Sequence, residues 1–555
     1  MKKRIETDVI VIGSGPVGLV LAMEMAVRGV DVAVIETRTV GEPPSPKCNH
    51  VSARTMEYLR RLGVADRIRN AGMPRDYPHD VVFCTAMTGY ELSRIEIPSA
   101  NRRGVDLDGP DGWWPTAEPP HRANQMYVEP ILCEHAIRTP NVRIFNRTSY
   151  QSHVQNESGV EVLAEDLITG EEIAFSGRYL VGCDGGRSAV RKAIGSKFAG
   201  VDVVQRVQST QISAPGLRDL MSLDPAWMYI STNPRRFGTV LSIDGKDRWL
   251  IHNYLYREKD FDEIDRDWAI RAILGLDENF EFEIISNEDW VGRRLVADRF
   301  RDRRVFICGD ASHLWIPMAG YGMNAGIADA TNLSWMLSAV INGWGDSDLL
   351  EAYELERQPI TEQVSRYAMD IATRSFDQRG HLPDAIEEPG PEGDAVRRDV
   401  GRSLYDVNVP QFCCGGLNFG YFYDNSPILA YDGEKPPTYS MYDFEQSTVP
   451  GCRAPHVWVS EGESLYDRLG LDYSLVRIAP DADVARLLAA AKAAGMPLKL
   501  VDIDRKTAGD SYTYPLTIIR PDLHVFWRGQ TAPANPGALV DLMCGRQRVQ
   551  QSKIA

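Results

Sequence analysis

The chain has 555 residues, of which 43% are apolar and 25% charged, the composition of an ordinary globular protein with two to four domains. Its net charge of −16, with no long run of Lys and Arg, argues against a nucleic-acid partner. No apolar segment reaches the roughly 18 residues that span a bilayer, and the nine cysteines have no paired spacing, which favours a cytoplasmic protein with reduced thiols and no metal site.

The first 36 residues have the pattern of a dinucleotide-binding unit. An apolar strand at 8–12 runs into Gly13-Ser14-Gly15-Pro16-Val17-Gly18, a helix follows to residue 28, and a second strand ends at Glu36. Gly13 and Gly15 permit a tight turn close to a pyrophosphate, Gly18 lets the helix pack on the strand, and Glu36 accepts a ribose 2′-hydroxyl. The acid disfavours a 2′-phosphate, so NAD and FAD remain candidates for this pocket ahead of NADP.

The middle of the chain alternates between strands and loops. Residues 80–98 and 141–180 have strand patterns, 108–120 form a loop rich in Pro, Gly and Trp, and a helix is expected at 125–137. A second apolar strand, 179–181, runs into Gly182-Cys183-Asp184-Gly185. Strand-like runs across 204–256 predict a mostly antiparallel sheet, inserted between nucleotide-binding segments as the wall of a substrate pocket.

Within that sheet, residues 249–254 alternate between two faces. Trp249, Ile251 and Asn253 therefore share one surface, since successive side chains of a strand point to opposite sides. We expect this surface to face substrate; the competing account is core packing.

A third apolar strand, 305–308, ends at Gly309-Asp310. A loop with Pro317, Gly320 and Gly322 follows, and a long helix begins near Asn324. A carboxylate at a strand end suits a ribose hydroxyl, the glycines admit a flat ligand, and the helix N-terminus favours the negative charge of a reduced flavin. Beyond it, residues 376–446 indicate a loop-rich linker, and 447–545 a further α/β unit.

With these motifs in this order, the chain resembles the single-component flavoprotein aromatic hydroxylases, the p-hydroxybenzoate hydroxylase and phenol hydroxylase group, over roughly residues 5–375. The resemblance implies an α/β fold: a Rossmann-like FAD-binding domain with an inserted, mostly antiparallel substrate-binding sheet. The tail resembles the thioredoxin-like C-terminal domain of phenol hydroxylase relatives. It lacks Cys-x-x-Cys, which favours a structural or dimerisation role over redox activity. The implied domains are FAD-binding segments at 1–78, 109–187 and 291–375, a substrate-binding sheet at 79–108 and 188–290, a linker at 376–446 and the thioredoxin-like domain at 447–555.

The same resemblance assigns cofactor contacts. Gly13, Gly15, Gly18 and Glu36 would hold the adenosine half of FAD, with Asp310 near the ribityl and pyrophosphate groups. The isoalloxazine would be surrounded by Pro317, Gly320, Gly322, Met323 and Asn324. Gln125 matches a flavin-contacting Gln, Asp184 belongs to a motif tied to both FAD and the nicotinamide cofactor, and Lys47 stands where relatives usually carry Arg.

The reaction implied is hydroxylation of a phenolic ring with NAD(P)H and O₂ through a C4a-hydroperoxyflavin. Asn49, His50 and Pro317 are the catalytic candidates, and Tyr321 joins Trp249, Ile251 and Asn253 as substrate candidates. Asn49 cannot take a proton, whereas relatives can carry Asp or His there; His50 is either titratable or satisfied by the structure. His313 is expected to be structural.

Two other classes remain open at this stage. One is flavin-dependent oxidation or epoxidation of a non-aromatic substrate, and the other is a non-catalytic FAD-binding or assembly protein. The expected partners are a small aromatic substrate and O₂, with a homodimer as a further possibility from the resemblance.

Overall fold

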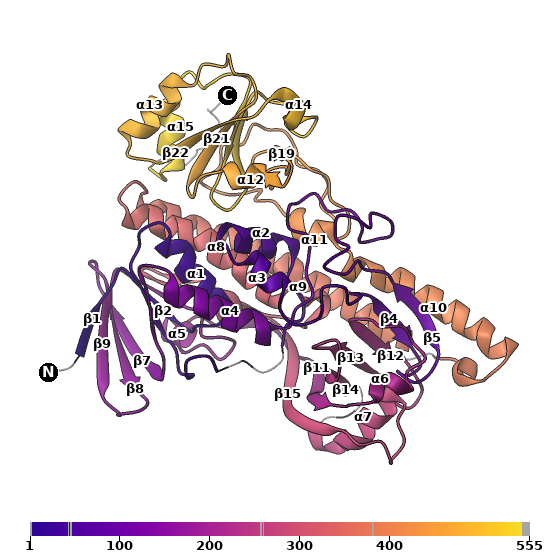
Figure 1. The fold of residues 1–555 in the computed structure, drawn as a ribbon. Helices are drawn as coiled ribbons and strands as arrows, with labels where there is room; N and C mark the ends of the chain where they lie inside the picture. Colours follow the sequence, from indigo (N-terminus) through magenta and orange to yellow (C-terminus); the bar gives the residue numbers. More distant parts are fainter. Residues whose placement is uncertain are drawn as a thin grey trace.

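The computed structural model describes residues 3–42, 44, 47–255, 258, 260–379 and 382–546. Three parts are visible in Figure 1: a nucleotide-binding part at the lower left, an eight-stranded sheet at the lower right, and a C-terminal unit above them. The long helices α8 (Gly322–Ile341) and α9 (Ala352–Arg379) lie beneath the C-terminal unit.

The nucleotide-binding part is built on a six-stranded sheet in the order β16-β17-β10-β2-β3-β6. All neighbours are parallel except β16 and β17. Every residue of β2, β3 and β10 is buried, as expected of parallel strands covered on both faces. The strands are β2 (Val9–Ile12), β3 (Val32–Ile35), β6 (Val142–Phe145), β10 (Tyr179–Gly182), β16 (Arg301–Asp302) and β17 (Val305–Ile307).

Short helices and a second sheet complete this part. The helices are α1 (Pro16–Ala26), α2 (Ala53–Arg61), α3 (Ala65–Arg69), α4 (Gln125–Arg138) and α5 (Ala189–Ala193), with 3-10 turns η2 (Gly309–Ala311), η3 (Met318–Gly320) and η4 (Ser347–Glu351). A four-stranded sheet in the order β1-β9-β8-β7 lies beside the N-terminus in Figure 1. Its strands are β1 (Lys3–Glu6), β7 (Thr148–Gln155), β8 (Val160–Asp166) and β9 (Glu172–Gly177).

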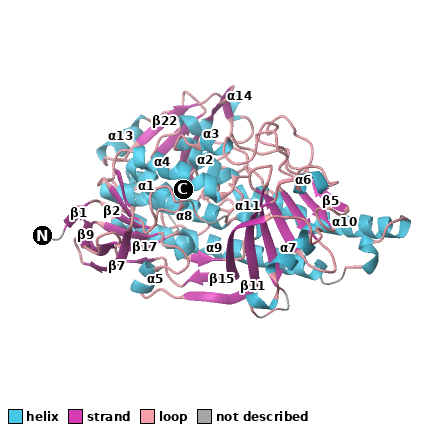
Figure 2. Ribbon diagram, turned by 60° about the horizontal axis from the view of Figure 1, so that its bottom comes forward, coloured by secondary structure: helices cyan, strands magenta, loops and turns pink. Residues whose placement is uncertain are grey.

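The eight-stranded sheet has the order β18-β15-β11-β14-β13-β12-β4-β5 and is antiparallel except between β12 and β4. The prediction of a mostly antiparallel inserted sheet is therefore confirmed. Figure 2 shows its strands side by side, with α7 against it. The elements are β4 (Val81–Cys84), β5 (Glu91–Ile95), β11 (Phe198–Ser213), α6 (Leu217–Leu220), β12 (Met228–Ser231), β13 (Gly238–Ser242), β14 (Arg248–Leu255), η1 (Phe261–Glu263), α7 (Arg266–Leu274), β15 (Glu283–Ala297) and β18 (His313–Leu314).

Two apolar clusters distinguish the faces of this sheet. On the face that we call outer, Trp249 and Ile251 pack with Ile270 and Ile273 of α7. On the opposite, inner face, Leu250 and Leu241 pack with Phe412 and other residues outside the sheet. The inner face is therefore the one turned toward the rest of the molecule.

Residues 376–446 are not as loop-rich as the sequence pattern indicated. They include η5 (Asp384–Glu387), the 22-residue helix α10 (Pro391–Phe412) and α11 (Gly415–Phe419). The Pro, Gly and acidic cluster that suggested a loop is the start of α10, with Pro391 in the first turn and Glu392 and Asp394 at the positive end of the helix dipole. Gly401 lets α10 approach β5 so closely that a Cβ there would collide with the Leu92 carbonyl.

The C-terminal unit matches the predicted α/β pattern. Its four-stranded sheet has the order β22-β21-β23-β24. The elements are β19 (Trp458–Ser460), β20 (Glu463–Ser464), α12 (Leu465–Arg468), β21 (Tyr473–Arg477), α13 (Ala485–Ala493), β22 (Leu498–Asp502), α14 (Arg505–Ala508), β23 (Leu516–Ile519), β24 (Val525–Gly529) and α15 (Pro536–Met543).

One apolar core runs from the nucleotide-binding part into this unit. Trp335 of α8 packs edge-on against Tyr473 of β21, with ring centroids 5.7 Å apart, and both side chains are buried. The same cluster joins Leu333 and Leu337 to Leu475 and Ile518. The C-terminal unit is therefore packed as part of one body with the nucleotide-binding part. Among the described residues, no helix is both long and apolar enough to cross a membrane.

Candidate cofactor and substrate site

The ends of four parallel strands meet along one edge of the six-stranded sheet. Ile12, Ile35, Gly182 and Ile307 pair in register, so the residues that follow them project together. The turn at Gly13 lies so close to the next strand end that a Cβ there would collide with the Cys183 carbonyl, and its φ of +103° also requires glycine. The three glycine-containing turns predicted from separate parts of the sequence thus lie side by side.

Glu36 is held in a network at the end of β3. One of its oxygens accepts hydrogen bonds from the Ser14 backbone N and Oγ at 2.9 and 2.8 Å, and the other accepts from the Arg38 backbone N at 2.9 Å. Burial opposes ionisation of this carboxyl, but hydrogen bonds from Arg38 and Ser14 outweigh it and lower its pKa to about 2. Glu36 is therefore an ionised acceptor, and it lines a pocket together with Arg38, Glu42, Glu129, Pro130 and Asn146.

The backbone beside this pocket leaves space for a phosphate-bearing ligand. A Cβ at Gly15 would meet no atom within 4 Å, and the same holds at Gly322 at the start of α8. Neither α1 nor α8 has a capping side-chain hydrogen bond or an acid in its first turn, so their N-terminal N–H groups remain available to an anion. Gly18 differs, because a Cβ there would collide with the Gly13 carbonyl; its role is packing within the turn.

Asp310 follows Gly309, which lies against Val17 of α1 and Gly326 of α8. The Asp310 residue is exposed to solvent, but desolvation by the surrounding protein raises the pKa of its carboxyl. The positive charges of His313 and Lys47 oppose this shift. Lys47 also pairs with Glu288 of β15 across 3.7 Å. Lys47 thus interacts electrostatically with Asp310 and also pairs with β15, on the inner face of the eight-stranded sheet.

The carboxylate of Asp184 stabilises the turn between β10 and α5. Its two carboxylate oxygens accept hydrogen bonds from Ser188 Oγ at 2.5 Å and from the backbone N of Ala189 at 2.7 Å, at the start of α5. Arg191 then donates to the carbonyls of Gly186 and Ala311, which fastens this turn to the one containing Asp310.

The loop before α8 is fixed mainly by Asn324. Its side chain accepts from the Ser52 backbone N at 2.8 Å and donates to the carbonyls of His50 and Gly320 at 3.0 and 2.8 Å. This buried amide has its hydrogen bonds satisfied within the protein, so it positions the loop. Met323 is buried in the apolar core, whereas Pro317 is exposed.

His50 and Asn49 lie directly beside that loop. A Cβ at Gly320, whose φ is +63°, would be 2.9 Å from His50 Cβ. Arg122 donates to His50 Nδ1, and burial together with the charge of Arg122 lowers the pKa of His50 well below its ordinary value. His50 is therefore a neutral imidazole whose Nδ1 is held by Arg122.

The side-chain amides of Asn49 and Gln125 are also held by hydrogen bonds within the protein. Asn49 donates to the Lys47 carbonyl at 2.8 Å and accepts from Asn124 at 2.5 Å. Gln125, in the first turn of α4, donates to Glu129 at 3.1 Å. These contacts fix the entry of α4 beside the loop of Lys47.

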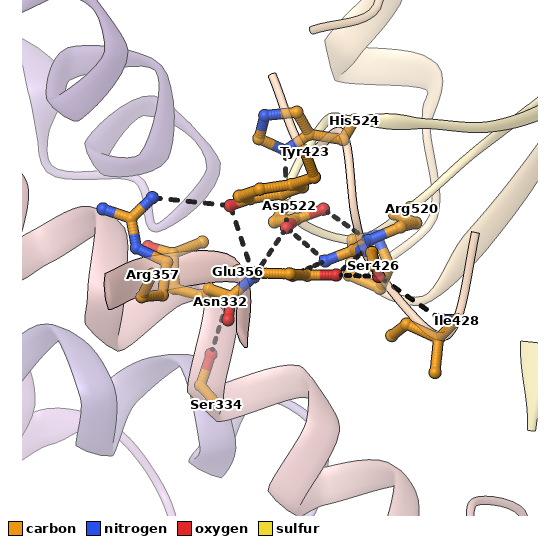
Figure 3. Close-up of polar contacts among 12 residues, drawn as sticks. Asn332, Ser334, Glu356, Arg357, Tyr423, Ser426, Ile428, Arg520, Asp522 and His524 are labelled. Atoms are coloured by element: carbon orange, nitrogen blue, oxygen red, sulfur yellow. Dashed lines mark hydrogen bonds and ion pairs between the residues drawn. The ribbon is translucent and has the colours of Figure 1, made fainter. Parts of the chain in front are cut away.

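A buried polar network connects the Asp310 turn to the C-terminal unit. His313 and Arg357 bind the two oxygens of Asp329 at 2.6 and 2.7 Å, and the His313 ring stacks on Trp315. Arg357 leads through the Tyr423 hydroxyl to Asn332, which donates to Glu356 and Asp522 at 2.7 and 3.1 Å (Figure 3). His313 is thus structural, as expected, and α9 carries the network from the cofactor turn to the C-terminal unit.

The substrate candidates that the sequence placed on residues 249–253 are buried on the outer face of the sheet. Trp249, Ile251 and Asn253 project from the outer face: the first two belong to the core beneath α7, and Asn253 is buried between Gln208 and Arg236. The core-packing account is therefore the correct one. Tyr321 is also buried, with its hydroxyl donating to the Leu417 carbonyl at 2.8 Å, so it fastens α11.

The opposite residues of the same strands, which the sequence interpretation passed over, form the inner face. His252 lies opposite Ser209, which lies opposite Glu288, the partner of Lys47. The strand alternation separates the two sets of residues, but it does not show which of the two faces packs toward the rest of the molecule.

Comparisons with known proteins agree with this geometry. The family described as "FAD binding domain" matches residues 6–368. Phenol 2-monooxygenase of Pseudomonas sp. (strain EST1001) is 29% identical over 98% of this chain and 93% of its own length. Among solved structures, the rebeccamycin biosynthetic enzyme RebC with reduced flavin is 31% identical, covers 98% of this chain and 100% of its own, and has a TM-score of 0.89. The flavin-dependent monooxygenase PieE in complex with FAD and substrate is 26% identical, covers 97% and 98%, and has a TM-score of 0.83.

Proposed function

The chain belongs to the FAD-binding family matched across residues 6–368, and from that premise we propose that it is an NAD(P)H-dependent monooxygenase that hydroxylates a phenolic ring with O₂. Relatives that are monooxygenases favour this function over a non-catalytic assembly role. A relative that acts on phenol favours an aromatic substrate over a non-aromatic one.

The observation that carries the proposal is the position of Lys47. The positive charge of Lys47 favours the ionised form of Asp310, in the turn after β17. The Nζ atom of Lys47 lies 3.7 Å from Glu288 on the inner face of the sheet. A ligand held at the strand ends and a ring held against the sheet would therefore be neighbours. Such proximity is what transfer between a bound cofactor and a substrate requires.

FAD fits the residues that surround the strand ends. Glu36 offers the ionised acceptor for a ribose hydroxyl, Gly15 leaves open space for the pyrophosphate, and Gly13 and Gly18 shape the turn. Asp310 would face the ribityl chain, and Pro317, Gly320 and Gly322 would border the ring system, with the buried Met323 and Asn324 behind them. Gln125 and Asp184 hold the adjoining elements in place. Bound FAD would supply electron transfer and oxygen activation, which none of these side chains performs.

The protein's own share of the chemistry is orientation and exclusion of water. His50 stays neutral and Asn49 carries no ionisable group, so we propose that both orient ligands and that neither removes a proton from the ring hydroxyl. The exposed Pro317 would present an apolar surface to the flavin ring. The apolar core shared by α8, α9 and the C-terminal unit would limit access of water from that side of the molecule.

We also propose that the protein works as a cytoplasmic homodimer. All nine cysteines are free, which suits a reducing compartment. Sedimentation of the purified holoprotein measures the assembly directly: a mass of one chain would contradict the dimer.

The test of the function is turnover. Purified protein reconstituted with FAD is mixed with NADH or NADPH, O₂ and a panel of phenols, and the products are identified by mass. We expect at least one phenol to accelerate NAD(P)H oxidation and to gain a single oxygen atom. Oxidation that no phenol accelerates, with no hydroxylated product, would contradict the proposal.

A further inference from the structure

The inner face of the eight-stranded sheet is filled by apolar side chains over only part of its width. Leu250, Leu241 and Phe83 pack there against Leu404 and Phe412 of α10. His252 and Trp290 lie outside that cluster and are only partly buried. The part of the inner face beside Glu288, the partner of Lys47, is therefore polar and not covered by this apolar cluster.

Three side chains at this open end form a directed chain of hydrogen bonds. Trp290 Nε1 donates to Ser209 Oγ at 2.7 Å, and Ser209 Oγ lies 2.6 Å from His252 Nδ1. An indole N–H is only a donor, so Ser209 must accept from Trp290. Ser209 is buried and the proton of its hydroxyl has no other acceptor among the described residues, so it goes to His252 Nδ1.

This direction fixes the tautomer of His252. Because Nδ1 accepts, a neutral His252 carries its proton on Nε2. Desolvation by burial lowers the pKa of His252 to about 4, so the ring is neutral at physiological pH. Nε2 has no hydrogen-bond partner in the part of the chain that the structure describes, yet it is not among the sealed-off polar atoms. The Nε2–H group is therefore a hydrogen-bond donor of fixed orientation that has no acceptor among the described residues.

We propose that His252 is a substrate-binding residue whose Nε2–H donates to an oxygen on the aromatic ring, with Ser209 and Trp290 as positioning residues that hold its tautomer. This inference rests on the proposed function and names the substrate feature read by the site: a ring hydroxyl, phenolate or carbonyl oxygen. A donor that cannot accept favours the deprotonated phenol, whose ring carbons are the better nucleophiles. The site discriminates against rings without the oxygen, because an analogue that lacks it leaves the donor unpaired.

The experiment measures binding to the oxidised holoprotein, without NAD(P)H, through perturbation of the flavin spectrum. The probes are phenol and 2-naphthol, each paired with an analogue of similar shape that lacks the oxygen, toluene and 2-methylnaphthalene. His252→Phe removes the donor, and His252→Gln returns an N–H near the Nε2 position. We expect His252→Phe to raise the Kd of the phenols about tenfold to a hundredfold and to leave the Kd of the hydrocarbons within about twofold, with partial recovery in His252→Gln.

Trp290→Phe tests the positioning role, and Trp249→Phe is its matched control. Both variants remove an indole N–H from the same sheet, but Trp249 is on the outer face and its Nε1 has no partner among the described residues. We expect only Trp290→Phe to weaken binding of the phenols selectively.

Each outcome decides the question. Equal loss of phenol and hydrocarbon binding in His252→Phe, or no loss at all, would overturn the assignment while phenol hydroxylation by the unmodified protein stands. If no phenol perturbs the flavin and none is hydroxylated, the proposed function fails and the inference fails with it.

Discussion

Glu356 on α9 and Arg520 at the end of β23 form a two-pronged ion pair, with N–O distances of 2.6 and 2.8 Å and both side chains fully buried. Arg520 also binds Asp522 at 2.8 Å, and Asn332 of α8 donates to both acids. Because these residues come from α8, α9 and the C-terminal unit, the pair joins parts of the chain that are 164 positions apart. Through Arg357 and Asp329 the network continues to His313, beside the cofactor turn.

Removal of one partner of this pair should destabilise the whole molecule. Arg520→Met leaves Glu356 and Asp522 as buried charges without their cation, and we expect the free energy of unfolding to fall by about 3–5 kcal/mol. Urea denaturation checks this, together with the temperature at which FAD is released. Arg468→Met is the control, because it breaks a solvent-exposed pair with Glu463 and should leave the urea midpoint almost unchanged. Equal effects of the two substitutions would contradict the importance of the buried pair.

Alanine substitutions at two glycines of the turn after β2 should impair the protein for different physical reasons. Gly15→Ala places a methyl group in open space, so the protein should fold with an unchanged urea midpoint but bind FAD at least about tenfold more weakly. Gly18→Ala collides with the Gly13 carbonyl, so folding itself should suffer. Gly537→Ala, in α15 far from the site, is the control for an added methyl group. Normal FAD affinity in Gly15→Ala would mean that the pyrophosphate does not pass there.

Glu36 should matter through its hydrogen bonds to FAD. Glu36→Gln removes the charged acceptor, and we expect the Kd of FAD to rise about tenfold to a hundredfold, since a hydrogen bond to a charged group contributes about 1.5–3 kcal/mol. Fluorescence titration of the apoprotein with FAD measures this. Glu161→Gln, an exposed carboxylate paired with Arg4, should leave FAD affinity unchanged. A Kd that is the same in both variants would remove Glu36 from the cofactor site.

Stability should fall as the pH drops from about 6.5 toward 5. Burial lowers the pKa of five buried histidines: His50, His79, His121, His456 and His524. Their pKa in the unfolded chain is about 6.5, so between the two values the unfolded chain binds more protons, and stability rises with pH there. Burial lowers the pKa of His121 to about 3, so substitution of this histidine should change the pH dependence of stability clearly.

The measurement is the urea midpoint at pH 7.5, 6.5 and 5.5, with and without His121→Gln. We expect the midpoint to decrease with acidity, and to decrease less in His121→Gln because one proton-uptake site is missing. A midpoint that rises on acidification would show that these histidines gain protons on folding, the reverse of what their burial implies.

The sequence by itself determined the nucleotide-binding half of this protein. Gly13, Gly15, Gly18 and Glu36 lie within 24 residues in one strand–helix–strand unit, so their geometry is local and the pattern carries it. The strand ends at Asp184 and Asp310 were also readable, because parallel strands bring their carboxyl ends to a common edge.

Only the tertiary structure decided the substrate wall, and the physical reason is the period of two along a strand. Alternation divides 249–254 into two sets, but the docking of α7 on one face decides that Trp249 is core and that His252 lies on the opposite, inner face. The same holds for His50, which is neutral because it is buried and because Arg122 approaches from 72 positions away, and for Glu356 with Arg520. Such contacts depend on how separate elements pack, and no local pattern records that.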